Sequence, residues 1–296
     1  MPVSLAESYR RCTRLSRTQA RNFYYSFLCL PPAKRAAMCA IYAFMRISDD
    51  ISDGGEGDEQ ARMAGWRASL DRALVGEYGD SPYLPAFHDA VTRYHIPHEY
   101  FHQLIDGAVM DLTPSHYETF ADTYRYCYHV ASVVGLVCIH VFEFEDPEAI
   151  QLAEYNGIAF QLTNILRDLR EDAQLDRVYL PAEDLRRFGY REEELRAGTE
   201  NDAFRVLMRF EVERARQYYD RAAPLVELIH ADSRPCLRAM RAIYHGILER
   251  IVAQNYDVFS QRARVPTWRK LMIAGGAMWQ ARAIAREAEG KRLSNA

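Results

Sequence analysis

The 296-residue sequence lacks the features that mark membrane-spanning, secreted or nucleic-acid-binding proteins. No apolar run approaches the ~18 residues needed to cross a bilayer, and the nearest candidate, 130–144, is interrupted by His140. The N-terminal 21 residues carry charges throughout and contain no hydrophobic core of a secretion signal. The formal net charge of −4 provides no basic body for a phosphate backbone. We therefore expect a cytoplasmic protein with no nucleic-acid partner.

The sequence contains few cysteines, and their spacing matches no metal-binding motif. The six cysteines form no CxxC pair, which argues against a zinc site. Most of them stand among apolar residues, as small buried side chains do, and this favours free thiols in a reducing compartment. They are Cys12, Cys29, Cys39, Cys127, Cys138 and Cys236.

Alternating strand patterns are also scarce, whereas helical periodicity dominates the chain. Proline and glycine punctuate the periodic stretches, and Asp146-Pro147-Glu148 is a clear helix start. The irregular stretch 173–200 predicts a loop with short helices. We expect an all-α protein with a single domain over 1–296. Its expected helices cover 4–28, 33–53, 58–76, 82–94, 98–112, 117–143, 147–173, 202–231, 234–258 and 266–288.

A first acidic motif, Asp49 to Asp53, lies at the end of an expected helix. The two aspartates are four residues apart and share one helix face, where like charges repel unless a cation lies between them. The same face continues backward through Arg46 and Tyr42 into apolar residues. This pattern suits a ligand with a charged head and an apolar tail.

A second acidic motif comprises Gln161, Asn164, Asp168 and Asp172, which fall within about 80° of one another on a helix. This polar stripe borders an apolar stripe, so we expect it to face a cavity. Carboxylate and amide oxygens turned inward need metal or cationic partners. Oxygen ligands of this kind suit magnesium, which also binds substrate phosphates. Two such helices facing each other predict a magnesium-bridged diphosphate site.

The chain resembles the squalene/phytoene synthase family over about residues 15–275. The resemblance implies an isoprenoid synthase fold with helices around a central cavity. It rests on motifs spread along the chain. They are 22–27 (NFYYSF), 40–46 (AIYAFMR), 49–53 (DDISD), 107–112 (GAVMDL), 126–131 (YCYHVA), 161–172 and 177–181 (RVYLP).

The resemblance also implies roles for individual residues. The implied magnesium ligands are Asp49, Asp53, Asn164, Asp168 and Asp172. Tyr42 and Arg46 are implied beside the departing diphosphate, and Tyr126 in proton handling. The implied substrate-binding residues are Arg21, Asn22, Phe23, Gln161, Tyr244 and Arg264. Candidate cavity walls are Phe23, Tyr24, Phe27, Val130, Val134 and Leu162, each of which also fits ordinary helix core.

Within the family, the N-terminal motifs look most like bacterial presqualene diphosphate synthases of hopanoid pathways. This implies joining of two farnesyl diphosphates to presqualene diphosphate, with Mg²⁺ as cofactor. No GxGxxG follows a strand pattern, so NADPH is not expected. Phytoene, dehydrosqualene and full squalene synthases share the ionisation machinery and remain open as alternatives. The oligomeric state is not predicted.

Two further interpretations come from other classes. The ExxH pairs Glu99/His102 and Glu227/His230 fit a di-metal helix bundle, but both pairs lie at expected helix ends, which disfavours it. Near the C-terminus, tryptophans stand among basic residues. We favour a docked terminal helix there, with peripheral contact to the inner membrane face as the alternative. The residues concerned are Trp268, Arg269, Lys270, Met278, Trp279, Arg282, Arg286, Lys291 and Arg292.

Overall fold

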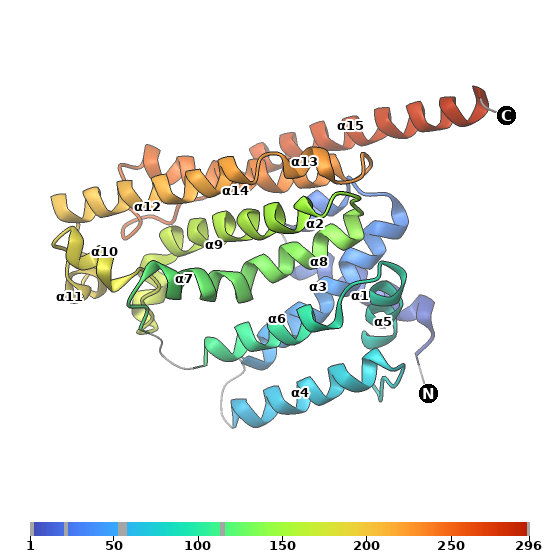
Figure 1. Cartoon of the computed structure of the whole chain (residues 1–296), viewed down its shortest axis with the longest axis horizontal. Coiled ribbons are helices and arrows are strands. Elements are labelled where there is room, and N and C mark those ends of the chain that lie inside the picture. Colours follow the sequence, from blue (N-terminus) through green and yellow to red (C-terminus); the bar gives the residue numbers. More distant parts are fainter. Residues whose placement is uncertain (1–2, 21–22, 53–57, 113–115, 295–296) are drawn as a thin grey trace.

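The computed structural model describes residues 3–20, 23–52, 58–112 and 116–294 (Figure 1). Across these ranges the protein is all-α, as predicted, and the only β contacts are two isolated bridges, His116 with Val178 and Phe144 with Ile229. The six cysteines are buried and free, which confirms the expectation for them.

The helices follow one another along the chain with short connections. They are α1 (Leu5–Gln19), α2 (Phe23–Phe27), α3 (Pro32–Ser52), α4 (Glu59–Leu74), α5 (Leu84–Arg93), α6 (His98–Met110), α7 (Phe120–Cys127), the π-helical turn η1 (Tyr128–Ser132), α8 (Val133–Phe142), α9 (Glu148–Gln174), α10 (Ala182–Arg187), α11 (Glu192–Arg196), α12 (Asp202–Arg221), α13 (Leu225–Leu228), α14 (Arg234–Ala253) and α15 (Thr267–Ser294).

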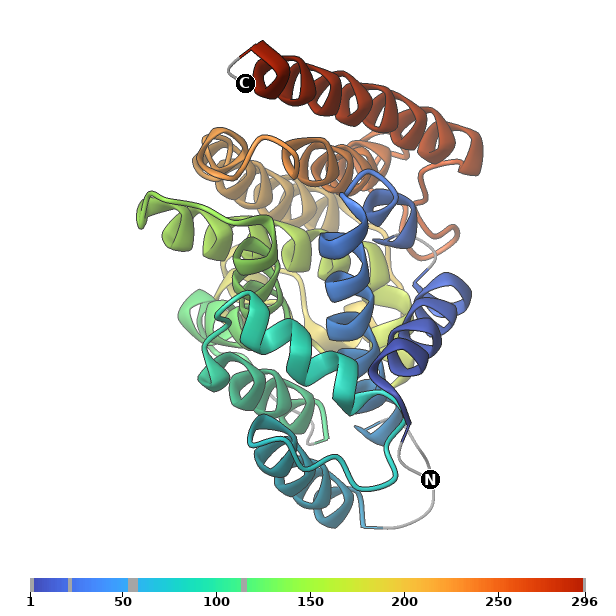
Figure 2. The ribbon, with the colours of Figure 1, turned by 90° about the vertical axis from the view of Figure 1, so that its right-hand side faces the viewer.

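The two helices that carry the acidic motifs, α3 and α9, form the framework of the bundle. Helix α9 packs against α7, η1, α8, α12 and α14, whereas α3 packs against α1, α4, α5, α6 and α8. Figures 1 and 2 show these layers from two directions, with α15 at one edge of the bundle and α4 at the opposite edge. Helix α8 contacts both α3 and α9 and so connects the two groups of helices.

Several expected boundaries are wrong for identifiable reasons. The expected helix 202–231 ends at Arg221, because Pro224 has no amide hydrogen with which to continue the helical bonds. The expected helix 234–258 ends at Ala253, because Asn255 and Tyr256 adopt positive φ angles of 53° and 66°. The expected helix 4–28 is divided into α1 and α2. The short helices α10 and α11 confirm the expectation for 173–200.

The continuous helix Phe120–Phe142, formed by α7, η1 and α8, is interrupted by one π turn. Gly157 makes the turn possible, since a Cβ there would lie 2.4 Å from the Ser132 Cα atom. This helix is long and apolar enough to cross a membrane, which the sequence did not indicate. Its most apolar part is 56% buried, and it packs against α6 and α9 as a core element.

Candidate active site

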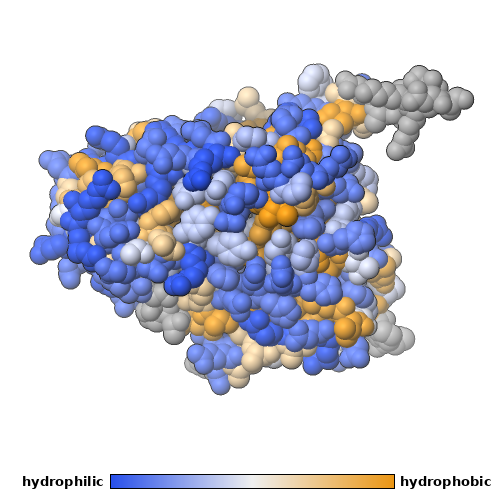
Figure 3. All heavy atoms as spheres, in the orientation of Figure 1, coloured by the Kyte–Doolittle hydropathy of each residue, from blue (hydrophilic) through white to orange (hydrophobic). Residues whose placement is uncertain are grey.

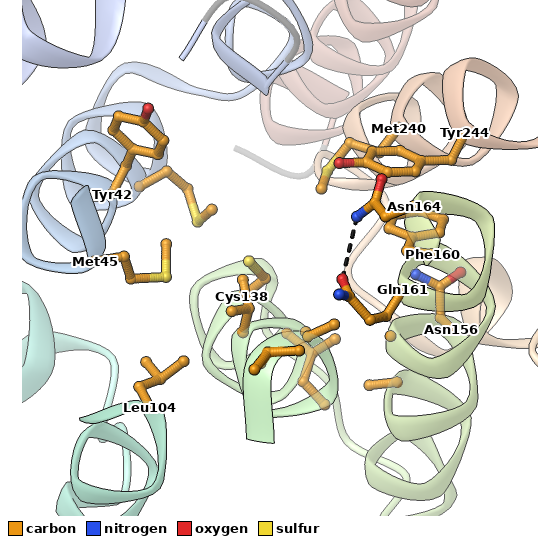
Figure 4. Close-up of a pocket in the computed structure, with 18 of the residues that line it drawn as sticks. Tyr42, Met45, Leu104, Cys138, Asn156, Phe160, Gln161, Asn164, Met240 and Tyr244 are labelled. Carbon is orange, nitrogen blue, oxygen red and sulfur yellow. Dashed lines mark hydrogen bonds between the residues drawn. The ribbon is translucent and has the colours of Figure 1, made fainter. Parts of the chain in front are cut away.

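A cavity of ≈ 300 Å³ lies between the two acidic helices (Figure 4). Side chains from α3, α6, η1, α8, α9 and α14 surround it, and most of them are apolar. In Figure 4, Tyr42 and Met45 of α3 and Leu104 of α6 lie across from Asn164, Gln161 and Phe160 of α9, with Met240 and Tyr244 of α14 above them. The cavity therefore has the position that the two acidic helices predict.

The apolar walls combine flexible and rigid side chains. Phe160 and Tyr244 stack with ring centroids 4.2 Å apart and form a flat aromatic wall. Three of the candidate wall residues, Phe27, Val130 and Val134, line the cavity. Leu162 is instead buried in the core, and the Phe23 side chain lies outside the described residues. Walls of this kind exclude water and suit a hydrocarbon chain.

The polar end begins with three side chains of α3 that line the cavity: Tyr42, Arg46 and Asp49. The Arg46 guanidinium pairs with Asp50 one turn later, while its buried Nε finds no hydrogen-bond partner among the described residues. Burial raises the pKa of the Tyr42 hydroxyl, so it stays protonated and can donate. Asp53, the second aspartate of this motif, lies outside the described residues.

Two amide side chains of α9 face this polar end. The Asn164 Nδ2 group donates to the Gln161 Oε1 atom at 3.1 Å (Figure 4). The Asn164 Oδ1 atom is buried and has no hydrogen-bond partner within the described part of the chain. A buried carbonyl oxygen without a partner is unfavourable unless a ligand contacts it, so Asn164 is oriented to accept a metal ion or donor from the cavity.

Farther along α9, the Asp168 carboxylate forms ion pairs with two arginines. It accepts from Arg167 Nε at 2.7 Å and lies 2.6 Å from Arg262 Nη2, which belongs to the loop between α14 and α15. Burial, together with the nearby Asp168 charge, raises the pKa of Asp172 to about 7. No three histidine, cysteine or acidic side chains converge as a metal site in the residues that the structure describes. The arginine pairing of Asp168 gives one reason for this.

The donor set nevertheless fits magnesium. Asp49 and Asn164 line the cavity from two helices, Asp168 and Asp172 stand about one and two turns after Asn164 on α9, and magnesium prefers oxygen ligands of this kind. The unpartnered Asn164 oxygen indicates that a cation or a hydrogen-bond donor is favoured here. These residues could hold the ion once the arginines release Asp168.

Tyr126 occupies a different position from the other candidate catalytic residues. It is 3% exposed and stacks on Tyr179 at 4.6 Å, behind the cavity wall. The two tyrosine hydroxyls are hydrogen-bonded, and the Tyr179 hydroxyl donates to Asp111 Oδ1 at 2.9 Å. Asp111 itself lines the cavity. A hydrogen-bonded chain therefore connects Tyr126 to the cavity through a carboxylate to which the sequence assigned no role.

The sequence contained part of that signal, because Asp111 and Tyr179 both stand in the motifs that carry the family resemblance. The remaining candidates are less informative. Tyr244 lines the cavity, whereas Arg264 is exposed. Arg21 and Asn22 lie outside the described residues. The ExxH pairs do not assemble a metal site, since His102 lies near Asp71 and Glu227 pairs with two arginines.

Comparisons with known proteins show the family and the fold. The family model described as squalene/phytoene synthase matches residues 16–269. A relative named 15-cis-phytoene synthase, from Synechococcus elongatus, is 39% identical over 293 residues, covering 94% of this chain and 95% of the relative.

Two solved structures are similar over most of the chain. A dehydrosqualene synthase in complex with a ligand superposes with a TM-score of 0.85 at 28% identity, covering 94% of this chain and 98% of that one. The squalene synthase HpnC from Alicyclobacillus acidocaldarius superposes with a TM-score of 0.82 at 30% identity, covering 87% and 97% respectively. The fold is thus the all-α isoprenoid synthase fold.

Proposed function

This chain belongs to the squalene/phytoene synthase family of head-to-head prenyltransferases, and we propose that it joins two geranylgeranyl diphosphates into phytoene. The observation that carries the proposal is the cavity itself. Arg46 and Asp49 on one helix and Gln161 and Asn164 on another open onto one apolar chamber. This arrangement suits two molecules that each combine a diphosphate head with a hydrocarbon tail.

The choice of product rests on the relatives. The sequence favoured presqualene diphosphate from farnesyl diphosphate, whereas a relative 39% identical over nearly the full length is named 15-cis-phytoene synthase. A second cyanobacterial relative with the same name, from Synechocystis, is 36% identical over 296 residues. These names support phytoene as the product over presqualene diphosphate.

The first step is ionisation of one allylic diphosphate. Asp49, Asn164, Asp168 and Asp172 would hold magnesium, which would supply Lewis-acid stabilisation of the departing diphosphate. Arg46, whose Nε is buried at the cavity, adds positive charge, and the protonated Tyr42 hydroxyl can donate a hydrogen bond to the same leaving group. Attack by the double bond of the second molecule and loss of one proton then close a cyclopropane.

The second step ionises the cyclopropyl diphosphate, and loss of one further proton from the rearranged cation yields phytoene without a hydride donor. Because the cation is neutralised by loss of a proton, phytoene formation needs no NADPH, in agreement with the expectation from the sequence. The aromatic wall of Phe160 and Tyr244 keeps water from the cation. Tyr126, Tyr179 and Asp111 form a hydrogen-bonded route by which a proton can leave the cavity wall.

A second candidate is condensation of two farnesyl diphosphates to presqualene diphosphate. The similarity to the squalene synthase HpnC, at 30% identity, favours it. Both candidates use the same ionisation residues and differ in the length of the tail that the apolar end accommodates.

Product analysis tests the proposal. The protein is incubated with Mg²⁺ and either C20 or C15 prenyl diphosphate, with and without NADPH, and products are identified by mass spectrometry. We expect phytoene from geranylgeranyl diphosphate, independent of NADPH, with a kcat/KM at least tenfold above that for farnesyl diphosphate.

A higher kcat/KM for farnesyl diphosphate, with presqualene diphosphate as product, would overturn the proposal in favour of the second candidate. Squalene formation that depends on NADPH would make the protein a full squalene synthase. Asp168→Asn serves as the inactive control, since it keeps the side chain's size but removes its charge.

A further inference from the structure

Helix α15 has two opposite apolar faces. Its inner face, which includes Ala274 and Ala277, is buried, and the helix packs against α14 and α2. At ~100° per residue, Trp268, Met272 and Trp279 fall within about 40° of one another on the opposite side. We call these three residues the outer face of α15. Met278, which the sequence grouped with them, turns instead toward the core.

The outer face is strongly exposed. Trp268, Met272 and Trp279 are 63%, 67% and 73% exposed, and the neighbouring Leu271 is 51% exposed. The other exposed large apolar side chains of the described chain are scattered over different elements. Figures 1 and 2 place α15 at the edge of the bundle, and Figure 3 shows hydrophobic atoms near its projecting end. A concentration of this kind indicates an interaction surface.

The charged residues from Val258 to Arg286 all have one sign, and the first acidic residues after them are Glu287 and Glu289. No aspartate or glutamate occurs between Val258 and Arg286, although the whole chain has a net charge of −4. The same stretch contains six cationic residues, and those nearest the outer face, Arg269, Arg282 and Arg286, are exposed. The stretch contains Arg262, Arg264, Arg269, Lys270, Arg282 and Arg286.

We propose that the outer face of α15 docks this protein onto the surface of an anionic lipid bilayer. Tryptophan is suited to the interface, because its ring is largely apolar and its N–H can bind headgroups. Exposed arginines beside it attract anionic lipids. Because the inner face of α15 remains packed on α14 and α2, the helix lies on the membrane and does not span it.

A bilayer fits this surface better than a second copy of the chain. Symmetric pairing of two outer faces would bring the arginines of both copies together, where like charges repel. Three or four side chains also provide little of the ~800 Å² per partner that a stable protein interface buries. An anionic membrane instead attracts the exposed Arg269, Arg282 and Arg286.

Docking at this position would place the site beside the lipid. The loop that leads into α15 contributes Arg262, which contacts the Asp168 carboxylate of the second motif. Burial, together with the Arg167 and Arg264 charges, lowers the pKa of Lys270 in the first turns of α15. The membrane-facing helix therefore begins next to the polar end of the site. Prenyl diphosphates, with tails that partition into lipid, would arrive at that end.

Vesicle flotation tests the proposal directly and needs no substrate, so its outcome is independent of the proposed reaction. The full chain is mixed with vesicles of phosphatidylcholine alone or with 30 mol% phosphatidylglycerol. We expect binding to the anionic vesicles, with at least tenfold weaker binding to neutral vesicles or at high salt. The triple variant Trp268→Ser/Met272→Ser/Trp279→Ser should lose at least tenfold of the binding to anionic vesicles.

A matched control is Val75→Ser/Leu175→Ser, which removes side chains that are 75% and 62% exposed elsewhere on the molecule. It should bind like the unmodified chain. Unchanged melting temperatures show that all variants fold. Equal loss of binding in both variants, or none in the triple variant, would overturn the proposal. It would also be overturned by a dimer that the triple variant converts to monomer while vesicle binding is absent throughout.

Discussion

The two acidic motifs occupy very different structural positions. The first lies at the C-terminal end of α3, where Asp49 reaches the cavity and Asp50 is half exposed beside Arg46. The second lies within α9, which is covered by α7, α8, α12 and α14. Its carboxylate at Asp168 is only 17% exposed and pairs with two arginines. One motif is open at a helix end, and the other is held within the bundle.

This difference indicates how a cation would be bound. The helix that carries the second motif fixes the positions of Asn164 and Asp168, so its ligands need little rearrangement in the backbone. Its negative charge is already compensated by Arg167 and Arg262. Magnesium must therefore compete with those arginines at the second motif.

The largest expected effect is loss of catalysis when either motif loses a ligand. We expect Asp49→Asn and Asp168→Asn each to lower kcat by on the order of 10²–10³-fold, because each removes charge from the leaving-group site. Circular dichroism and melting temperature should change little. Initial rates with saturating Mg²⁺ measure the effect.

Asp50→Asn is the matched control for the first motif. It removes the same charge one residue away, from an exposed ion pair with Arg46. The expected loss is less than about tenfold, since exposed ion pairs contribute up to ~1 kcal/mol. Equal effects of Asp49→Asn and Asp50→Asn would mean that α3 contributes only general negative charge.

A smaller effect is expected at Arg262, which makes the difference between the motifs directly measurable. Arg262→Gln leaves Asp168 with fewer competing cations. We expect magnesium to bind the substrate-free protein about fivefold more tightly, which corresponds to loss of an ion pair worth ~1 kcal/mol. Isothermal titration with Mg²⁺ gives the affinity.

Arg269→Gln is the control, because it removes an equal charge from the same stretch at an exposed position on α15. Weaker magnesium binding in Arg262→Gln would contradict the competition and would show that Arg262 supports the metal site instead.

Much of the fold follows from local sequence. Pro32 and the Asp146-Pro147-Glu148 start define the beginnings of α3 and α9, and the Asp146 side chain accepts from the Glu148 amide at 2.9 Å. The π turn at 128–132 could not be predicted in this way. It depends on Gly157, which comes from a different helix and allows close approach to Ser132.

The site was predictable to the extent that it depends on helical spacing. Residues three apart on one face gave Gln161 and Asn164, and both line the cavity. The pairing of Asp168 with Arg262 joins residues 94 apart in the chain, and the link from Asp111 to Tyr179 spans 68. No periodicity reports such contacts, because tertiary packing alone creates them.

Helix α12, which packs against the helix of the second motif, contains a buried ionisable side chain. Glu211 of α12, the helix packed along α9, is 1% exposed and shares the Arg214 guanidinium with the buried Asp184. Burial, reinforced by the Asp184 charge and only partly offset by Arg214, raises the pKa of Glu211 to about 8.

The last prediction is a pH dependence of stability at this cluster. An unfolded glutamate has a pKa of about 4.3, so between about pH 4.3 and pH 8 the folded chain binds more protons than the unfolded chain. The free energy of unfolding should therefore fall as pH rises through this window, by at most ~1.4 kcal/mol per pH unit. Glu211→Gln cannot ionise and should flatten the decline. Urea unfolding at pH 5.5, 7.0 and 8.5 measures it, with the exposed Glu213→Gln on the same helix as control. Parallel profiles for the unmodified chain and Glu211→Gln would show that Arg214 keeps Glu211 ionised throughout and that the support of the second motif does not depend on pH.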